Sequence, residues 1–480
     1  MTGVTDAFHH ESRVPTIHRV LDFVQRPESR EAARRAFLSL FRAILREKER
    51  NNLSDIVDLL IVELDAVLTR QLNAVMHHEK FQRLESSWRN LQYLVSVIRF
   101  DQNIQLAFIN VSKDDLLDDF DGAPEITRSG LYRHVYTAEY GQFGGQPIAV
   151  VIADYSFGPG ARDMQLLRAA VGVSAMAHSI FLAMADPSFF DIENWDAFSH
   201  VKSLDSLFGM PQYTRWRSFR GYADSRYAAL LVPGFLLRLP YGNAATPVDT
   251  FAFEEDTHAF QHYCWGSTAF VLAGRMADSF AKYRWCFNML EQDDKTAETA
   301  MARYHFYATG DRFSRVPVGT LISGQAENRL AALGFIAAIF RESANRVGFL
   351  SANSCHERLD TGRNEEELGE ALSVQLPYIT IITRLAHYIK VIQRDHIGTW
   401  KDGRTIQNEL NKWLSQYVTE TDDPDPLTRS RRPLRMARVV VHEGSTESSW
   451  FDVTLLVRPH IRHMGANFTL TLASRLDKRG

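Results

Sequence analysis

Two pairs of histidines are the first candidates for metal chemistry in this sequence: His77 with His78, and His460 with His463. Neutral imidazole is a common metal ligand, and a zinc site usually combines it with cysteines or carboxylates at short, regular spacing. Neither pair has a cysteine or carboxylate at ligand spacing. We therefore expect ordinary surface or packing roles for these histidines, and the sequence predicts no metal site.

An acidic run near residue 115 suggests calcium at first sight. Its members are Asp114, Asp115, Asp118, Asp119 and Asp121, and Gly122 follows them. The run lacks the order of oxygen ligands found in an EF-hand loop, and it lacks the closing glutamate. A solvated helix face is the expected role.

Three glycines, Gly141, Gly144 and Gly145, form a short stretch that could cradle an anion. Their spacing matches no dinucleotide-binding fingerprint, and glycines at this density are typical of turns. The sequence also has no phosphate-binding loop, no H-E-x-x-H, no G-x-S-x-G and no C-x-x-C. We predict no catalytic residue and no cofactor.

Aromatic and arginine side chains alternate between residues 195 and 227. They are Trp195, Tyr213, Trp216, Phe219, Tyr222 and Tyr227, with Arg215, Arg217, Arg220 and Arg226. Such a mixture can stack nucleic-acid bases, but the same residue types are enriched where proteins pack together. We favour aromatic packing with arginines at a protein interface. An enzyme pocket near Trp216–Tyr227 with Asp224 is the alternative, although no nucleophile, base and orienting group occur together.

The whole chain has the composition of a folded protein with several domains, because 45% of its 480 residues are hydrophobic and 23% are charged. A formal charge of -4 provides no broad positive field, so nucleic acid is not an expected partner. The first residues lack the apolar core of a secretory signal. The most apolar helical stretch, Val171–Ala185, is broken by His178 and is shorter than the roughly 20 residues that a bilayer requires. We expect a cytosolic protein without direct membrane insertion.

Long helices are predicted over the first hundred residues. Their expected spans are Thr16–Arg26, Ser29–Arg50, Ser54–Met76 and Phe81–Ile98. In the first helix, an apolar stripe at helical spacing contains Ile17, Val20, Leu21 and Val24. The third is a long amphipathic helix with Ser54 as its N-cap, and its stripe includes Leu64, Leu68 and Leu72. Trp88 belongs to the apolar stripe of the fourth.

Beyond residue 100 the pattern changes to short strands and helices in alternation, which is typical of a mixed α/β domain. The predicted strands are Ile104–Val111, Ile148–Asp154, Tyr227–Val232 and Gly334–Phe340. The predicted helices are Gln165–Ala177, Ala259–Phe280 and Pro377–Asp395. The charged segment Glu291–Thr299 is expected to be a loop.

Three strand-like runs follow a proline-bearing linker at Thr419–Pro433. They are Leu434–His442, Trp450–Val457 and Asn467–Leu476. In the last run, Phe468, Leu470 and Leu472 alternate with threonines, which indicates a sheet with one buried face. Strands close to a terminus can leave an edge free to pair with another chain.

Several blocks of residues, in order from about residue 55 to the end, carry a family resemblance. They are Gln71–Asn73, Met76–His78, Phe81–Leu91, Ser129–Tyr132, Glu139–Gly141, Phe143–Gly145, Asp154–Tyr155, Asp224–Tyr227, Leu236–Gly242, Leu376–Tyr378, Ala386–Tyr388, Arg394–Gly398 and Arg458–His460. Together they resemble the TssC (VipB-like) family, the large sheath subunit of type VI secretion. Departures at Tyr263–Ser267 and Gly234 indicate a divergent member or a paralogue.

The resemblance implies an α/β (mixed α+β) contractile-sheath fold in four parts. These are an N-terminal helical segment (1–52), a helical region that packs with the small sheath subunit (53–100), a central α/β domain (101–376) and a C-terminal β-rich domain with inter-subunit strands (377–480). It further implies a heterodimer with the small subunit TssB, which polymerises with other copies around an Hcp-like inner tube and contracts to propel it. The sheath would lie in the bacterial cytoplasm, docked through a baseplate to a membrane-anchored complex. A specialised baseplate or sheath-cap paralogue is the alternative.

The resemblance also assigns roles to particular residues. Inter-subunit pairing is expected at Phe451, Val453, Leu455, Val457, Phe468, Leu470 and Leu472, and the partner-helix interface at Leu64, Leu68, Leu72 and Trp88. A disassembly ATPase of the AAA+ class is expected to bind Ile17, Val20, Leu21 and Val24, with permanent packing of that helix as the open alternative. The basic residues Lys390, Arg394 and Lys401 are candidates for facing the tube, because charged contacts can release without a large hydrophobic penalty.

Overall fold

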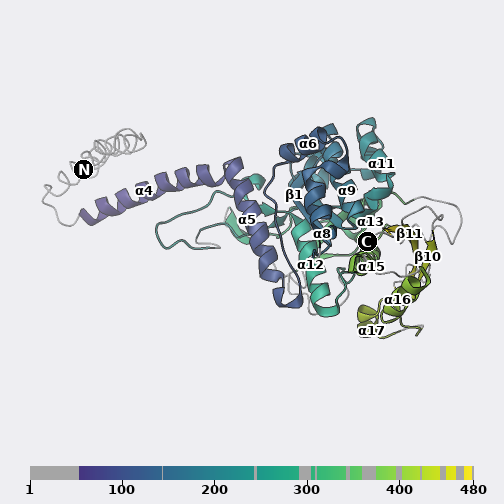
Figure 1. The fold of residues 1–480 in the computed structure, drawn as a ribbon. Coiled ribbons are helices and arrows are strands. Elements are labelled where there is room, and N and C mark those ends of the chain that lie inside the picture. The colour runs from purple at the N-terminus through teal and green to yellow at the C-terminus, as the bar shows by residue number, and fades with distance from the viewer. Residues whose placement is uncertain are drawn as a thin grey trace, which may run out of the picture. The chain divides into compact units, whose positions relative to one another are not determined.

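The computed structural model describes most of the chain beyond residue 52 (Figure 1). The described residues are 53–142, 144–242, 246–290, 304–308, 311–341, 346–358, 374–395, 403–421, 424–443, 450–460 and 470–477. The chain divides into two units. The first contains Met1–Leu84, Arg238–Tyr263 and Tyr304–Phe313, and the second contains Glu85–Leu237, Cys264–Arg303 and Ser314–Gly480. The predicted helices Thr16–Arg26 and Ser29–Arg50 and the predicted loop Glu291–Thr299 lie outside the described residues.

Helix α4, Leu53–Met76, is the main element of the first unit. It is rich in leucine, which loses little freedom in a helix, so propensity and apolar pattern agree with the predicted long helix. Ser54, expected as the N-cap, already lies inside the helix. The segment 238–263 is held along α4 by Asn73, whose side-chain amide donates to the carbonyl of Glu254 and accepts the N–H of Asp256.

Helix α5, Glu79–Val97, begins after a short turn and confirms the fourth predicted helix. Its buried residue Asn90 links it to two other elements of the second unit. The side-chain amide donates to the Asp154 carboxylate at 3.0 Å and accepts the N–H of Ser267 at 3.2 Å. Burial raises the pKa of Asp154. A polar contact of this kind fixes the helix against the strand that carries Asp154.

A five-stranded sheet with the order β1-β2-β3-β8-β9 lies at the centre of the second unit. Its strands are β1 Val150–Phe157, β2 Ile180–Ala185, β3 Ala228–Val232, β8 Phe335–Arg341 and β9 Arg346–Phe349. The first four run parallel, and β9 pairs antiparallel with β8. The middle strand β3 is buried along its whole length, which explains its continuous apolar sequence. The predicted strands at Ile148–Asp154, Tyr227–Val232 and Gly334–Phe340 are confirmed.

The two faces of this sheet have different coverings. Helix α12, Thr268–Tyr283, packs with Leu182 and Ile336 in one hydrophobic cluster. Because successive strand residues point to opposite faces, Phe335 is directed to the other side. There its ring contacts an aromatic cluster that includes Trp216. The core of the second unit therefore lies on both faces of the sheet.

Helix α9, Ala161–Met176, ends just before His178, which has a positive φ of 53°. A side-chain-bearing residue in the left-handed region commonly ends a helix. The predicted helix Gln165–Ala177 is confirmed. The expectation that the apolar stretch Val171–Ala185 is helical is wrong for the part beyond His178, which forms strand β2.

Two further predictions differ from the structure. Ile104–Val111 contains no strand, and its Phe108 is 76% exposed. This run has β-rich composition, but no neighbouring strand pairs with it in the described part of the chain. The predicted helix Ala259–Phe280 begins only at Thr268, where Ser267 caps it, because the preceding residues form a turn and the short strand β5, Trp265–Gly266.

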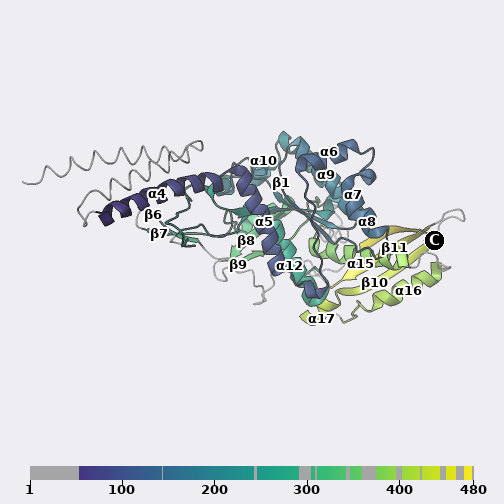
Figure 2. The same cartoon turned by 60° about the vertical axis from the view of Figure 1, so that its left-hand side comes forward.

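A second sheet, with the antiparallel order β10-β11-β12, lies in the C-terminal part (Figure 2). Its strands β10 Leu434–Glu443, β11 Trp450–Pro459 and β12 Leu470–Asp477 confirm the three predicted runs. Helices α15 Leu376–Asp395, α16 Gly403–Ser415 and α17 Pro426–Arg431 precede it. The shared core contains Ile381 and Leu385 of α15, Leu410 and Leu414 of α16, and Val439, Val453 and Leu455 of the sheet.

The remaining elements are short. They are α6 Lys113–Gly122, α7 Gly130–Tyr132, α8 Ala138–Tyr140, α10 Leu204–Phe208, α11 Thr214–Arg220, β4 Phe235–Leu236, β6 Tyr304–Ala308, β7 Asp311–Arg315 and α13 Gly324–Ala332. Within the described ranges, no helix has the length and apolar character needed to cross a membrane.

Candidate functional site

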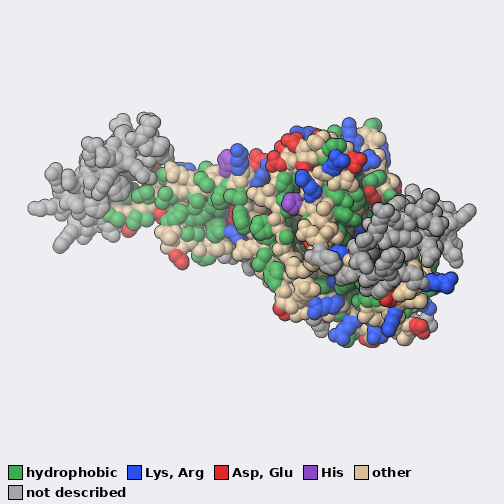
Figure 3. Space-filling view, viewed as in Figure 1, with side chains coloured by type: hydrophobic (Ala, Val, Ile, Leu, Met, Phe, Trp, Pro, Cys, Tyr) green, Lys and Arg blue, Asp and Glu red, His purple; other side chains and the backbone are tan. Residues whose placement is uncertain are grey.

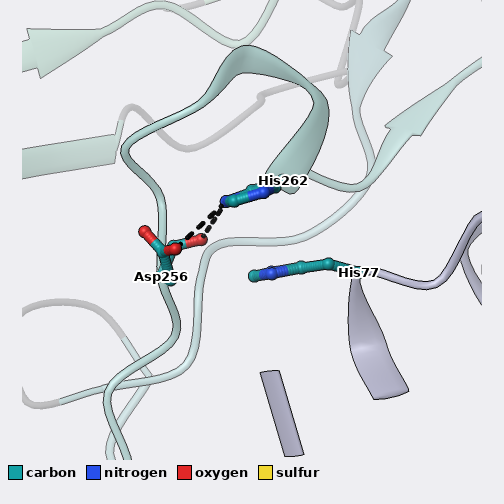
Figure 4. A group of neighbouring side chains, drawn as sticks. All are labelled: His77, Asp256 and His262. Atoms are coloured by element: carbon teal, nitrogen blue, oxygen red, sulfur yellow. Dashed lines mark hydrogen bonds and ion pairs between the residues drawn. The ribbon is translucent and has the colours of Figure 1, made fainter. Parts of the chain in front are cut away.

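His77, Asp256 and His262 come together in the first unit (Figure 4). His77 follows the end of α4, and the other two lie on the segment held along that helix. The imidazole rings of His77 and His262 stack, with centroids 4.0 Å apart and 7° between their planes. Nδ1 of His262 lies 3.1 Å from the carbonyl oxygen of Asp256 and 3.4 Å from its carboxylate. Burial lowers the pKa of His77, and the neighbouring His262 adds to this effect.

The three residues have the donor types of a metal site, and one donor atom from each lies within 4.8 Å of the others. An imidazole binds a metal along a lone pair in the plane of its ring, with a zinc–nitrogen bond of about 2.1 Å. Two parallel rings 4.0 Å apart direct these lone pairs along parallel lines. One ion cannot then lie in the plane of both rings. The arrangement suits ring packing, and we assign no ligand role to His77 or His262.

A buried ion pair fixes the same segment of the first unit. Nη1 of Arg238 donates to Glu255 Oε2 at 2.6 Å, and Nη2 donates to Oε1 at 2.9 Å. The carboxylate also accepts the N–H of Tyr241 at 2.8 Å, and the guanidinium lies over the Tyr241 ring. The sequence marks Arg238 only as part of a family-like block. No local signal identifies its partner Glu255.

The acidic run forms helix α6 and contributes to its local structure. Ser112 and Asp115 form a reciprocal capping box at the helix start, and these hydrogen bonds lower the pKa of Asp115. Asp119 accepts the N–H of Gly130 and thereby holds the start of α7. Most of the other aspartates of the run are exposed. The run therefore agrees with the predicted solvated helix face.

The glycine-rich turn surrounds a cation of the protein itself. Nη1 of Arg394, on α15, donates to the carbonyl oxygens of Glu139, Gln142 and Gly145 at 3.3, 3.1 and 2.8 Å. Carbonyl oxygens directed inward in this way attract positive charge and repel an anion. The prediction of a turn is confirmed, and the turn is held by Arg394.

Lys390, one helical turn before Arg394, is also bound within the second unit. Its Nζ lies 5.1 Å from the ring centre of Tyr136 and 4.8 Å from that of Tyr140, and it donates to the carbonyl of Met176. Burial lowers the pKa of Lys390 to about 8. Both cations thus have structural contacts, and their tube-facing role stays a prediction. Lys401 lies outside the described residues.

The arginine-rich aromatic segment forms part of the core. Tyr213, Trp216 and Phe219 are almost completely buried, and the rings of Trp216 and Phe335 stack. Arg220 is also buried and donates to two main-chain carbonyls. The predicted aromatic packing is confirmed. Its predicted place at a protein interface is wrong for these buried residues.

Ser225 and His356 bring a hydroxyl and an imidazole together near the same segment, with Ser225 Oγ 2.9 Å from His356 Nδ1. A nucleophilic serine must be accessible, and a third group must orient its base. Ser225 is fully buried, and its one hydroxyl hydrogen is shared between the carbonyls of Arg220 and Tyr222. This geometry suits a structural bond and gives no support to an enzyme pocket at Trp216–Tyr227.

An apolar row along α4 is partly exposed to solvent. Its members, Ile61, Leu64, Leu68, Leu72 and Val75, follow at intervals of three or four residues and therefore lie on one side of the helix. Ile61 is 50% exposed and Val75 is 54% exposed. Hydrophobic side chains are gathered along α4 in the space-filling view (Figure 3). The partner-helix residues predicted on α4 belong to this row, which we call the α4 stripe.

Helix α5 carries a second row of exposed apolar side chains. They are Phe81, Leu84, Trp88 and Val95, and Trp88 is 62% exposed. A tryptophan indole so widely open to water is unusual in a subunit that works alone. The partner role predicted for Trp88 stays a prediction that this exposure favours.

The C-terminal sheet leaves only some main-chain groups open to a partner. Strand β11 is central, and both of its edges pair within the chain. The predicted inter-subunit residues on β11, Phe451, Val453, Leu455 and Val457, thus pair with β10 and β12 in the single chain. Their role in pairing between subunits stays a prediction. Leu470 and Leu472 lie on the edge strand β12, and Phe468 lies outside the described residues.

The antiparallel register fixes which groups of β12 face outward. Val439 of β10 bonds through both its N–H and its C=O to Asn411, so both groups point away from β11. Hydrogen-bonded and non-bonded pairs alternate along such a ladder. Leu455, opposite Val439, therefore directs its main-chain groups to Leu472 of β12. The residues on either side of Leu472 present their N–H and C=O groups at the outer edge.

The fold, the α4 stripe and the outer edge of β12, which pairs with no other described strand, are features of a subunit that assembles, and two family models agree with that class. Residues 58–356 match the EvpB/VC_A0108 (VipB) tail sheath N-terminal domain. Residues 365–476 match the tail sheath gpW/gp25-like domain of the same family. The chain therefore belongs to the VipB tail sheath family, and its mixed α/β fold is a contractile-sheath fold.

Among characterised relatives, the chain is similar to the type VI secretion system sheath protein TssC1 of Pseudomonas aeruginosa. The two are 33% identical over 432 residues, which cover 88% of this chain and 86% of the relative. The resemblance to the large sheath subunit is thereby confirmed. The chain has a structural role in a type VI secretion sheath.

Proposed function

We propose that this chain binds the small subunit TssB, and that the heterodimers polymerise around an inner tube and contract to propel it. The α4 stripe is the observation that carries this proposal. Aliphatic side chains that stay partly exposed in a continuous row are costly in water, whereas a partner helix would bury them. The spacing of three and four residues suits an amphipathic helix as the occupant.

The size of this contact fits a subunit interface. Fully burying a leucine or valine side chain stabilises by about 1.5–3 kcal/mol. Burying the exposed part of five such side chains contributes on the order of 4 kcal/mol, before the cost of ordering the partners is subtracted. A contact of this strength holds a heterodimer when further contacts, such as one at Trp88, add to it.

Strand addition at β12 is the second part of the proposal. An edge strand with open N–H and C=O groups binds a further strand through main-chain hydrogen bonds. Such a link persists while the α/β bodies of neighbouring subunits rotate and exchange their lateral contacts. A bias of a few kcal/mol per subunit, repeated over a cooperative array, suffices to make contraction irreversible.

The remaining partners belong to the same proposal. The Hcp-like inner tube is expected to contact the cationic candidates Lys390, Arg394 and Lys401. An AAA+ disassembly ATPase is expected to bind the predicted helix that contains Ile17, Val20, Leu21 and Val24. The assembly is placed in the bacterial cytoplasm, where a baseplate docks it to a membrane-anchored complex.

Co-expression with the small subunit and negative-stain microscopy test this function. The wild-type pair is expected to form long tubules. The double variant Leu68→Asp/Val75→Asp is expected to lose the heterodimer, because each change places a charge in the α4 stripe. Ala74→Asp is the matched control, since Ala74 is exposed on the same helix but outside the stripe. Tubules of normal length from the double variant would remove the stripe from the interface, and discrete particles from the wild type would favour a baseplate or cap paralogue.

A further inference from the structure

The two outer edges of the C-terminal sheet differ. The outer edge of β10 faces α16 and the residues that follow this helix. In the described part of the chain, β12 has a strand neighbour on one side only. An open edge strand is a template for any other strand, and proteins commonly block an edge that they do not use.

Two amide side chains of α16 occupy the edge of β10. Oδ1 of Asn411 accepts the N–H of Val439 at 2.9 Å, and Nδ2 donates to the carbonyl of Val439 at 2.9 Å. Oε1 of Gln407 accepts the N–H of Val441 at 2.9 Å. Nδ2 of Asn411 also donates to the main-chain carbonyl of Gln407 at 2.9 Å. The orientation of the Asn411 amide is fixed by its contacts, because both neighbours of Nδ2 are carbonyl oxygens and the neighbour of Oδ1 is an N–H group.

A carboxamide offers the same donor and acceptor as a peptide group. Asn411 therefore bonds to Val439 as a residue of a neighbouring antiparallel strand does, by exchanging both hydrogen bonds with one residue. The bonds also use the groups of Val439 that point away from β11. A strand that approached this edge would have to displace Asn411 first.

The other end of β10 is covered by main chain. Leu434 accepts the N–H of Thr419 at 2.8 Å and donates to the carbonyl of Tyr417 at 3.3 Å. Helix α16 is held in place by Leu410 and Leu414, which are buried in the core beneath the sheet. The covering is therefore anchored by packing and does not depend on the amides alone.

We propose that Gln407 and Asn411 close the outer edge of β10, so that the sheet accepts another strand only at β12. The occupant at β12, a strand from a second copy of this chain, rests on the proposed function. With one edge closed, each sheet has a single acceptor. With both edges open, a sheet grows in two directions and subunits join without a defined order.

Hydrogen exchange on the isolated full-length chain tests the closed edge directly. Asn411→Ala is expected to speed amide exchange at Val439 by about fivefold or more, and Gln407→Ala is expected to do the same at Val441. Asn408→Ala is the matched control, because Asn408 is exposed on the same helix. If the alanine variant of Asn411 unfolds, Asn411→Leu replaces it, since leucine has a similar size and lacks the acceptor for the N–H of Val439. Unchanged exchange at Val439 in a folded variant would overturn the proposal.

Self-association is the second readout. The double variant Gln407→Ala/Asn411→Ala is expected to form larger species in light scattering, whereas the wild type and Asn408→Ala keep their size. Adding Ala473→Pro removes an outward N–H of β12, and the association is expected to persist because it uses β10. If the species formed by the double variant have the same size as those of the wild type, the proposal is wrong. If the wild type forms no tubules with its small subunit while these two results hold, the proposed function fails and the closed edge stands.

Discussion

The Glu255 carboxylate binds both terminal nitrogens of Arg238 within the first unit, at 2.6 and 2.9 Å. The two side chains are 1% and 9% exposed, respectively. Removing charges from water costs free energy. The bidentate geometry of this pair and a further hydrogen bond from the N–H of Tyr241 offset that cost. The pair holds the segment that lies along α4, the helix that carries the α4 stripe.

Breaking this pair is expected to destabilise the protein strongly. Glu255→Gln removes the charge of the carboxylate that binds the buried Arg238 guanidinium, which costs about 3–5 kcal/mol in the free energy of unfolding. Glu79→Gln is the control, because its ion pair with Arg83 is exposed and contributes at most about 0.5 kcal/mol. Urea unfolding of both variants measures the difference. Equal losses would contradict the structural role of the buried pair.

Stability is expected to fall as the pH decreases from about 6.5 toward 3. Burial lowers the pKa of both His178 and His387 to about 3, and the nearby positive charge of Lys390 adds to this effect. The unfolded chain then binds more protons than the folded chain in this window, so acid favours unfolding. Within this pH window, each histidine lowers the free energy of unfolding by up to about 1.4 kcal/mol per pH unit.

His387→Gln tests this pH dependence, because glutamine can still donate to the carbonyl of Ala177, which His387 Nε2 meets at 3.0 Å. The variant is expected to show a smaller loss of stability between pH 7 and 5 in urea titrations. The same slope in both proteins would show that His387 does not contribute.

Truncation of Phe335 is expected to leave a cavity. The side chain is fully buried and contacts the rings of Phe189, Phe208 and Trp216. Phe335→Ala should lower the free energy of unfolding by about 3–5 kcal/mol. Phe108→Ala, at a widely exposed position, should change it by less than about 0.5 kcal/mol. Thermal and urea unfolding compare the two variants.

The predicted N-terminal helix is expected to matter after contraction. Leu21→Asp/Val24→Asp disrupts its apolar stripe and should spare tubule assembly while blocking disassembly by the AAA+ ATPase and ATP, as followed by microscopy. His18→Asp introduces a charge on the same predicted helix outside the stripe and serves as the control. Normal disassembly of the double variant would remove these residues from the ATPase site.

Local patterns predict the elements that carry a strong period. The stripe of α4 and the alternation in β12 are visible in the sequence, because each depends on neighbours within a few positions. Strand β2 is hidden, since Val171–Ala185 reads as one apolar run and only the backbone of His178 divides it. Ile104–Val111 shows the reverse case, where strand-like composition finds no partner strand.

Contacts between distant residues are the part that the sequence leaves out. The pairing of Asn411 with Val439 joins positions 28 residues apart, and no sequence pattern in either segment predicts it. The same holds for Arg394, whose family-like block gives no sign that it is enclosed by the carbonyls of a glycine turn. Tertiary packing decides these contacts, so residue types alone do not reveal the carbonyls that Arg394 meets.

The central position of β11 has a mechanical consequence. A pull along β12 loads the ladder between β12 and β11 in shear, so its hydrogen bonds resist together instead of opening one after another. The second ladder passes this tension to β10, and β10 is tied to α16. Tension that arrives at the edge of the sheet therefore spreads into the packed interior within the width of three strands.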